Sequence, residues 1–291
     1  MMSSSTCKED VMKHIKNALY TLGVLAVLGI VLCVSTAIAQ LGAEAIAKGI
    51  GFSLKDDWLY SISGSMGTAI TGALCAFYAK RKKYTDCIEA KEPFRVKTGL
   101  YYGLISFCIC SVLFYAISTF LFVNVFSLTG EVFVPAQKSW IDIVLTDVIF
   151  TIIMAPIFEE LLFRMGLYSL LRRRIGKIGS ILIVTLVFAA IHGYSIEGFC
   201  ACLTGGLLHM LIYVRTGNIW YSIVAHMVCN LDATIFNALE AKGVAFWGFP
   251  VQYEINGFNM VHPVLVVTAA VILGICITKE VKAARRAKCV S

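Results

Sequence analysis

Residues Ile153–Leu171 read IMAPIFEELLFRMGLYSLL, an apolar helical run that holds two adjacent acids, Glu159 and Glu160, and one base, Arg164. One charge at the centre of a membrane helix costs about 2.5–3.5 kcal/mol on insertion scales. Three such charges need pairing or contact with water, and a simple membrane anchor has no use for them. The stretch therefore predicts a functional site inside a membrane-spanning segment.

Helical spacing gives the three charged residues different roles. Glu160 and Arg164 are four residues apart, so they share a face and are expected to form an ion pair. Glu159 is rotated by about 100° from Glu160, which predicts that it faces a cavity. Pro156 lies one turn earlier and lacks a backbone donor, which predicts a kink that exposes a carbonyl near the acids. The alternative is a structural cluster in which the charges clamp neighbouring helices together.

The composition is typical of an integral membrane protein. Of the 291 residues, 58% are hydrophobic and 15% are charged, and the mean hydropathy is +0.80. Soluble proteins carry about 25% charged residues. No polar block is long enough for a separate soluble domain. The 11 cysteines are scattered through the apolar runs, which is typical of small buried residues and not of a disulfide framework.

The predicted fold is an all-α bundle of about eight transmembrane helices in a single membrane domain. The expected spans cover residues 17–41, 58–79, 98–126, 140–171, 178–193, 196–214, 219–239 and 261–278. The membrane domain is thus residues 17–278, with a catalytic core at about residues 140–239. Residues 1–16 are predicted to be a cytosolic tail and residues 279–291 a basic cytosolic tail.

Three local features are also expected from the sequence. Small residues such as Gly64, Gly67 and Gly72 in the second span would allow helices to approach closely. The stretch Ala43–Leu54 is predicted to be an amphipathic segment at the outer interface. Residues 247–253 are predicted to lie in a loop before the last span.

The basic residues predict the orientation of the chain. Twenty of the 25 Lys and Arg residues lie in the N-terminal tail, the second, fourth and sixth connections and the C-terminal tail. The opposite side holds only Lys48, Lys55, Lys138 and Lys242. Because cytoplasmic loops are enriched in Lys and Arg, both termini are predicted to be cytosolic in a multi-pass protein of the cell membrane. The net charge of +7 then marks one membrane face and does not predict nucleic-acid binding.

Further polar residues in the apolar spans complete a set suited to hydrolysis. His192 closes the pattern Phe-x-x-x-His on the fifth span, and His226 and Asn230 share one face of the seventh. Glu159 can take a proton from water with the assistance of His192. His226 and Asn230 can donate hydrogen bonds to the oxyanion of a tetrahedral intermediate. No Ser or Cys lies in a nucleophile motif, so the sequence favours attack by an activated water molecule.

Taken singly, each intramembrane His or Asn is also explained by a hydrogen bond between helices. His209 is given that interpretation because nothing is paired with it at helical spacing. Asp142 and Asp147 lie early in the fourth segment and are predicted to be solvated or to cap a helix.

Three motifs occur in order along the apolar spans: Glu159-Glu160-x-x-x-Arg164, Phe188-x-x-x-His192 and His226-x-x-x-Asn230. Together they resemble the CPBP intramembrane protease family, which includes type II CAAX prenyl endopeptidases and the bacterial Abi, or bacteriocin self-immunity, proteins. The resemblance implies an eight-helix core and cleavage of a peptide or prenylated-protein substrate at a water-filled cavity in the lipid bilayer. It also implies four catalytic residues with two supporting ones: Glu159, His192, His226 and Asn230, with Glu160 and Arg164.

Metal dependence is a separate question. Glu159, His192 and His226 could supply the three protein ligands of a catalytic zinc ion. However, the chain has no His-Glu-x-x-His motif, and Asn230 is a poor ligand where Asp would be a good one. The ligand chemistry therefore favours a glutamate-type mechanism without a cofactor, with zinc as the alternative.

Two other functions are consistent with these buried polar residues. The first is a non-catalytic bacteriocin-immunity or binding protein on the same scaffold. The second is a proton-coupled transporter, because buried Glu, His and Arg residues also form proton relays. Transporters usually contain internal repeats, and the first half of the chain has no second copy of the Glu-Glu motif.

Overall fold

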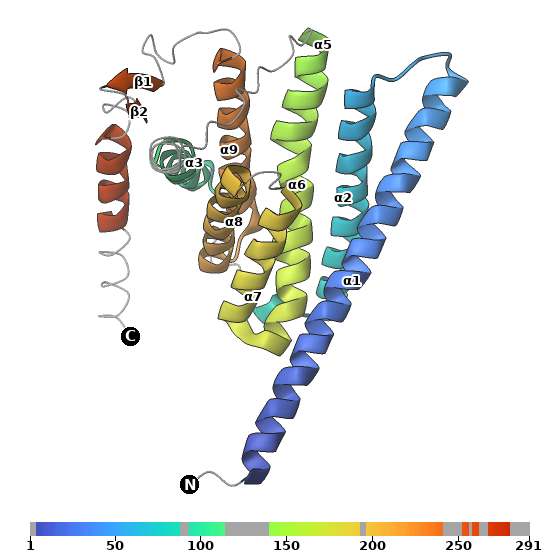
Figure 1. Cartoon of the computed structure of the whole chain (residues 1–291), viewed down its shortest axis with the longest axis vertical. Helices are drawn as coiled ribbons and strands as arrows, with labels where there is room; N and C mark the ends of the chain where they lie inside the picture. Colours follow the sequence, from blue (N-terminus) through green and yellow to red (C-terminus); the bar gives the residue numbers. More distant parts are fainter. Residues whose placement is uncertain are drawn as a thin grey trace. The chain divides into compact units, whose positions relative to one another are not determined.

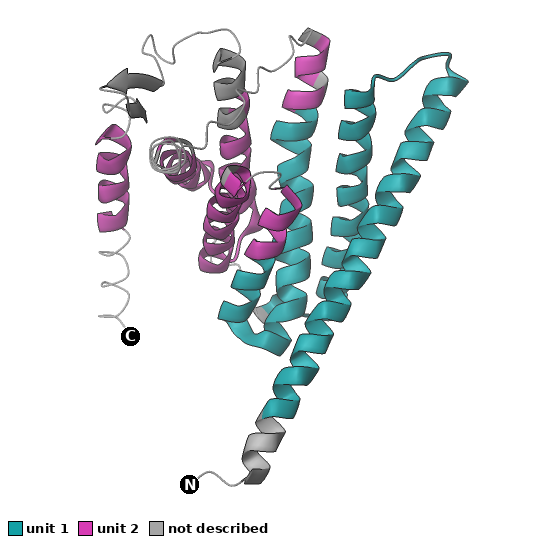
Figure 2. Ribbon diagram, viewed as in Figure 1, with its two compact units in different colours: residues 1–89, 149–184 teal, residues 90–148, 185–291 magenta. Residues whose placement is uncertain are grey.

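The computed structural model describes residues 4–87, 93–113, 140–192, 196–240, 252–255, 258–261 and 267–279. Most of these residues are helical, as predicted (Figure 1). They group into two compact units, coloured separately in Figure 2. Unit 1 contains residues 1–89 and 149–184, and unit 2 contains residues 90–148 and 185–291.

Several helices have the length and composition of membrane spans. Four described helices are long and apolar enough to cross a bilayer: Val11–Gly49, Asp56–Arg81, Thr146–His192 and Gly198–Thr216. Shorter apolar helices occupy Val96–Cys110, Ile219–Leu231 and Val267–Lys279. Large apolar side chains such as Leu22 and Ile30 are 63% and 64% exposed. A surface of this kind suits contact with lipid and not with water.

In unit 1, the helices α1 (Ser4–Gly49) and α2 (Asp56–Arg81) contact one another. The helix α1 extends beyond the predicted span at both ends and includes most of the stretch expected at the interface. Residues 43–48 are mainly Ala, Glu and Lys, which are strong helix formers, so the helix continues until Gly49. Gly51, just after the end of α1, has a positive φ of 71°. A short 3₁₀ turn, η1 (Thr85–Cys87), follows α2.

The helix that carries the acids is continuous but changes its winding. After α5 (Trp140–Asp142), it consists of η4 (Ile143–Met154), α6 (Ala155–Glu160) and η5 (Leu161–Tyr168). The segments η4 and η5 have the wider π-type winding, and Pro156 lies at the start of α6. Met154 keeps helical dihedral angles of φ −72° and ψ −46°. The helix therefore passes through the proline, and its winding tightens there.

Glycines allow α2 to approach this helix within unit 1. A Cβ atom on Gly72 would lie only 2.9 Å from the carbonyl oxygen of Phe158. A Cβ atom on Gly166 would lie 2.6 Å from Sγ of Cys75. The close packing predicted for the second span is thus present at Gly72, which seats α2 against the turn that carries the two acids. A Cβ atom on Gly64 would meet nothing within 4 Å, so this glycine does not take part.

The predicted break between the fourth and fifth spans lies in α7 (Ser169–His192). Gly176 has φ 77° and ψ 179° and separates two helical parts. Only glycine adopts this backbone conformation readily. The hydroxyl of Ser180 donates a 2.7 Å hydrogen bond to the carbonyl of Gly176 and stabilises the start of the second part.

Unit 2 is built around α9 (Ile219–Glu240), which contacts α3 (Val96–Ser106), η2 (Phe107–Leu113) and α8 (Ile196–Thr216). The hydroxyl of Tyr221 on α9 donates to the carbonyl of Pro93 at 3.1 Å. The same hydroxyl accepts a 3.1 Å hydrogen bond from the backbone N–H of Arg95. These two bonds fix the segment before α3 against α9.

The described part of unit 2 also contains a short β ribbon, which was not predicted from the sequence. The strands β1 (Gln252–Ile255) and β2 (Phe258–Val261) pair antiparallel, with Ile255 opposite Phe258. The intervening sequence, Asn-Gly, favours two-residue hairpin turns. Of the predicted loop at residues 247–253, residues 252 and 253 lie in β1, and residues 247–251 lie outside the described ranges. The same holds for residues 114–126 of the third predicted span and for the tail residues 280–291.

Candidate functional site

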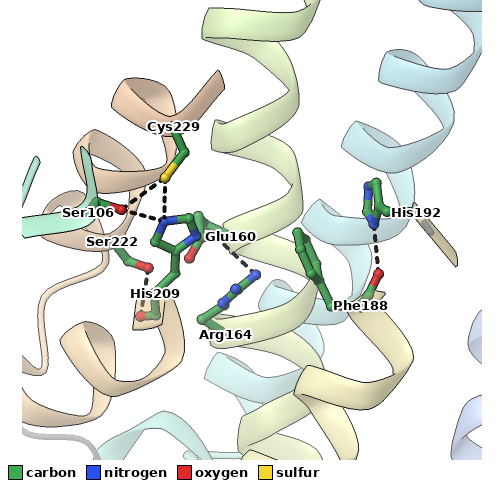
Figure 3. A network of polar contacts seen from close by, with 8 residues as sticks. All are labelled: Ser106, Glu160, Arg164, Phe188, His192, His209, Ser222 and Cys229. Carbon is green, nitrogen blue, oxygen red and sulfur yellow. Dashed lines mark hydrogen bonds and ion pairs between the residues drawn. The ribbon is translucent and has the colours of Figure 1, made fainter. Parts of the chain in front are cut away.

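The ion pair expected from helical spacing is present in unit 1. Nη1 of Arg164 lies 3.0 Å from Oε1 of Glu160 (Figure 3). The two side chains are 1% and 0% exposed. Because an isolated charge in such an environment costs several kcal/mol, each group stabilises the charged form of the other. The helix face that carries Glu160 and Arg164 is therefore buried within the protein.

Glu159 has a different environment from its neighbour. Its side chain is partly exposed, whereas Glu160 is completely buried. The rotation of about 100° between adjacent helical residues accounts for this difference. The two acids therefore differ in burial, and the 3.0 Å ion pair with Arg164 is formed by Glu160.

The acids earlier on this helix form local contacts. Asp142 and Asp147 are partly exposed. The hydroxyl of Thr146 lies 2.7 Å from the carbonyl oxygen of Asp142 and 2.9 Å from Oδ1 of Asp147. These contacts are local to the first turns of the element.

In unit 2, the tautomer of His192 follows from its hydrogen bond. Nδ1 of His192 lies 2.8 Å from the carbonyl oxygen of Phe188 (Figure 3). A carbonyl only accepts, so Nδ1 must carry the hydrogen. In the neutral ring, Nε2 then holds the lone pair. That atom is suited to accept a hydrogen bond from water or to bind a metal ion.

The ring of Phe188 contacts both histidines of the predicted site in unit 2. Its centroid is 4.5 Å from that of His192, with an interplanar angle of 35°. It is 5.8 Å from that of His226, which it meets edge-on at 74°. A Cβ atom on Gly206 would lie 2.8 Å from Cδ1 of Phe188, so the glycine leaves room for this ring. The Phe-x-x-x-His pattern thus connects two histidines that are distant in sequence.

His226 is buried and stacks on a third histidine that was not predicted to belong to the site. The rings of His226 and His209 have centroids 4.8 Å apart and an interplanar angle of 25°. Their side chains are 5% and 2% exposed. No periodic signal relates these residues, because they lie on different helices, so this contact was not predicted from the sequence.

His209 also forms the hydrogen bonds between helices that the sequence predicted. Its Nε2 atom lies 3.1 Å from Oγ of Ser106 and 3.7 Å from Sγ of Cys229. Oγ of Ser106 is itself 3.0 Å from Sγ of Cys229. The hydroxyl of Ser222 donates to the backbone carbonyl of His209 at 3.0 Å. This network joins α3, α8 and α9 (Figure 3). It also holds His209, whose ring stacks on that of His226.

Asn230 lies one helical turn after His226 on α9 and is partly exposed. Its backbone carbonyl accepts a 2.8 Å hydrogen bond from the hydroxyl of Thr234. The spacing of four residues places the two side chains on the same face of the helix, as predicted.

These features define a class of protein: a helical membrane protein with a buried ion pair on one apolar helix and a group of histidine rings on the helices of unit 2. Residues 141–231 match the family model described as "Type II CAAX prenyl endopeptidase Rce1-like". This segment is therefore similar to the CPBP/CAAX protease family, which confirms the resemblance based on the three motifs. No curated protein and no solved structure matches the chain.

Proposed function

We propose that the protein is an intramembrane endopeptidase that hydrolyses a peptide bond with a water molecule activated by Glu159 and His192. The observation that carries the proposal is the family match over residues 141–231, because this segment contains every residue assigned a catalytic role. Members of a protease family act on peptide or protein substrates, and the apolar helices imply that this substrate is reached from the membrane.

In the proposed reaction, the carboxylate of Glu159 takes a proton from water as the water oxygen attacks the scissile carbonyl carbon. His192 is proposed to assist through Nε2, the ring nitrogen that carries the lone pair of the neutral ring when Nδ1 donates to the carbonyl of Phe188. The water is then held by two acceptors, and its lone pair is directed at the substrate. The carboxylic acid formed at Glu159 later gives its proton to the leaving amine as the C–N bond breaks.

His226 and Asn230 are proposed to stabilise the tetrahedral oxyanion by donating hydrogen bonds to it. Support comes from the burial of His226, whose ring contacts those of His209 and Phe188. A donor that is already oriented loses little freedom when charge develops on the substrate oxygen. Removal of one such donor typically lowers kcat by about 10²–10³.

The supporting role proposed for Glu160 and Arg164 is electrostatic. Their short, buried ion pair balances two charges on the helix that also carries Glu159. Without that pairing, a buried carboxylate next to Glu159 would compete with it for protons.

Zinc is the alternative to a purely glutamate-based mechanism. Carboxylate and imidazole are suitable donors, and the Nδ1–H hydrogen bond of His192 is of the kind that orients metal-binding histidines. Glu159, His192 and His226 would then be the ligands, and the metal would supply Lewis-acid chemistry. We propose the mechanism without metal: activity should persist in 1,10-phenanthroline, and purified active protein should contain far less than one zinc per chain. Loss of activity with the chelator, restored by added zinc, would overturn this choice.

The name of the matching family suggests a prenylated peptide as the substrate class. We propose eight membrane crossings with cytosolic termini, so that the basic loops lie on the cytosolic side of the cell membrane. The protein would be reconstituted in liposomes with a fluorogenic farnesylated CAAX peptide and with the same peptide lacking the prenyl group. Faster cleavage of the farnesylated peptide is expected, and equal rates would remove the prenyl group from the proposal.

The variant Glu159→Gln tests the proposed base in this assay. General-base catalysis contributes about 10²–10⁴-fold, so the variant should lose at least about 100-fold in kcat/KM. The matched control is Glu44→Gln, because Glu44 is an exposed carboxylate on α1. Cleavage by Glu159→Gln at the wild-type rate would overturn the mechanism. If neither the wild-type protein nor Glu159→Gln cleaves the peptide, and Glu159→Gln still protects cells from a bacteriocin, the non-catalytic immunity function is the correct one.

A further inference from the structure

In unit 1, three consecutive arginines follow η5, the buried end of the helix that carries Glu159 and Glu160. Arg172, Arg173 and Arg174 lie in the first turns of α7, just before the reversal at Gly176. Arg173 and Arg174 are exposed and Arg172 is partly exposed. The sequence alone explains them only as positive charge on the cytosolic face of the membrane.

The structure shows that each of the three guanidinium groups lies over a tyrosine ring. Cζ of Arg172, Arg173 and Arg174 lies 5.8 Å, 4.7 Å and 5.0 Å from the ring centroids of Tyr168, Tyr84 and Tyr20 respectively. The tyrosines come from η5, from the turn after α2 and from α1. A cation over an aromatic face is held by the ring quadrupole. The N–H donors of the guanidinium, which lie in its own plane, can then bind an anion in a bidentate manner.

Backbone contacts within unit 1 hold this arrangement in place. Nδ2 of Asn17 on α1 donates a 2.9 Å hydrogen bond to the carbonyl of Arg174. The backbone N–H of Tyr84 donates to the carbonyl of Ala79 at 2.8 Å, which folds the turn back onto the end of α2. Lys83 takes a positive φ of 55° in that turn, a conformation rare for residues other than glycine. The three helices are thereby tied at one end of the unit.

More positive charge is added at the same end of unit 1. Nζ of Lys82 lies 5.9 Å from the ring centroid of Tyr78, and this ring meets that of Tyr84 edge-on at 6.3 Å. In the part of the chain that the structure describes, the side-chain contacts of Arg172, Arg173 and Arg174 are with aromatic rings and not with carboxylates. The charges of the cluster are therefore available to an external anion.

Exposed apolar side chains flank the cluster in the sequences of α1 and α7. Leu19 and Leu22, on either side of Tyr20 on α1, are each 63% exposed. Ile178 and Leu182, which follow the reversal of α7, are 73% and 54% exposed. A ligand that fills this surface needs an anionic head and apolar chains, which describes a phospholipid and not a soluble phosphate.

We propose that Arg172, Arg173 and Arg174, held by the three tyrosine rings, form a specific binding site for the phosphate headgroup of an anionic phospholipid. Guanidinium groups match the geometry of phosphate oxygens. Anionic lipids attract basic residues near the membrane surface by about 1 kcal/mol each. The tyrosine rings restrain the positions of the three guanidinium groups, whereas basic residues on an ordinary membrane face are not restrained in this way.

The test compares lipid retention by the full-length protein in native mass spectrometry. Dioleoyl phosphatidylglycerol is titrated against dioleoyl phosphatidylcholine, which has the same chains and no net charge. We expect tighter binding of phosphatidylglycerol and a loss of about 30-fold in the variant Arg173→Gln/Arg174→Gln, about fivefold for each charge removed. The control Arg215→Gln/Lys279→Gln removes two charges elsewhere and should leave the affinity within about twofold.

A second variant separates a built site from surface charge. Tyr20→Leu/Tyr84→Leu keeps every arginine but removes two ring contacts, each worth about 0.5–1 kcal/mol at exposed sites. The affinity for phosphatidylglycerol should therefore fall by at least about fivefold. Wild-type affinity in this variant, or an equal loss in the Arg215/Lys279 control, would overturn the proposal. Displacement of the lipid by millimolar inorganic phosphate would show that the anion alone is recognised and would also overturn it.

Discussion

The variant Arg164→Met should destabilise the protein, because the carboxylate of Glu160 then loses the cation that it contacts in the interior. Nη1 of Arg164 and Oε1 of Glu160 are 3.0 Å apart, and the two side chains are 1% and 0% exposed. Removal of one partner from such a pair costs about 3–5 kcal/mol, since water cannot solvate the charge that remains. Glu160→Gln should cost a similar amount, because it leaves a buried guanidinium group.

The double variant Glu160→Gln/Arg164→Met removes both charges and should be far less unstable than the sum of the single variants. A coupling free energy of at least about 2 kcal/mol is expected. Unfolding would be followed by tryptophan fluorescence as detergent-solubilised protein is titrated with sodium dodecyl sulfate. The exposed Glu44→Gln serves as the control for loss of a carboxylate. Costs below about 1 kcal/mol for both single variants, as for surface pairs, or costs that simply add, would refute the reasoning.

The same titration tests two further contacts. Gly72→Ala should lower the free energy of unfolding by about 1–3 kcal/mol, because its Cβ would lie 2.9 Å from the backbone oxygen of Phe158. The control Gly64→Ala should be neutral or stabilising, since nothing lies within 4 Å of that Cβ. Equal effects of the two variants would contradict the close packing of α2 at Gly72. His209→Leu should cost about 0.6–1.7 kcal/mol through loss of the 3.1 Å hydrogen bond to Ser106, and an unchanged free energy of unfolding would show that this bond has no net effect.

Contacts within one helix could be predicted from the sequence. The Glu160–Arg164 pair follows from a spacing of four residues, and the break between two spans at Gly176 follows from the basic run that ends one apolar segment. The local hydrogen bond of His192 to the carbonyl four residues earlier is also a consequence of helical geometry. In each case, the backbone of one element determines the distance.

Contacts between helices could not be predicted in the same way. The stack of His209 on His226 depends on how α8 and α9 pack, and their sequence separation contains no trace of it. His209 was therefore recognised as a structural residue but not as a neighbour of a proposed catalytic one. The three tyrosine rings beneath the arginine run come from separate elements of unit 1 for the same reason.

Hydropathy also sets limits on the prediction of element ends. The helix α1 runs from Ser4 to Gly49, well beyond its most apolar part, because the flanking residues favour helix irrespective of the membrane. The β ribbon was missed although the Asn-Gly pair between its strands is a strong hairpin signal. Apolar runs alone do not reveal a hairpin of this kind.

The most direct test of the proposed mechanism is the kcat/KM of the double variant Glu159→Gln/His192→Gln, compared with each single variant on the same peptide. If both side chains act on one water molecule, the double variant should be about as slow as Glu159→Gln alone, because residues that act as a unit are strongly non-additive. Rate losses that multiply in the double variant would mean that Glu159 and His192 act independently, and the proposed mechanism would be wrong.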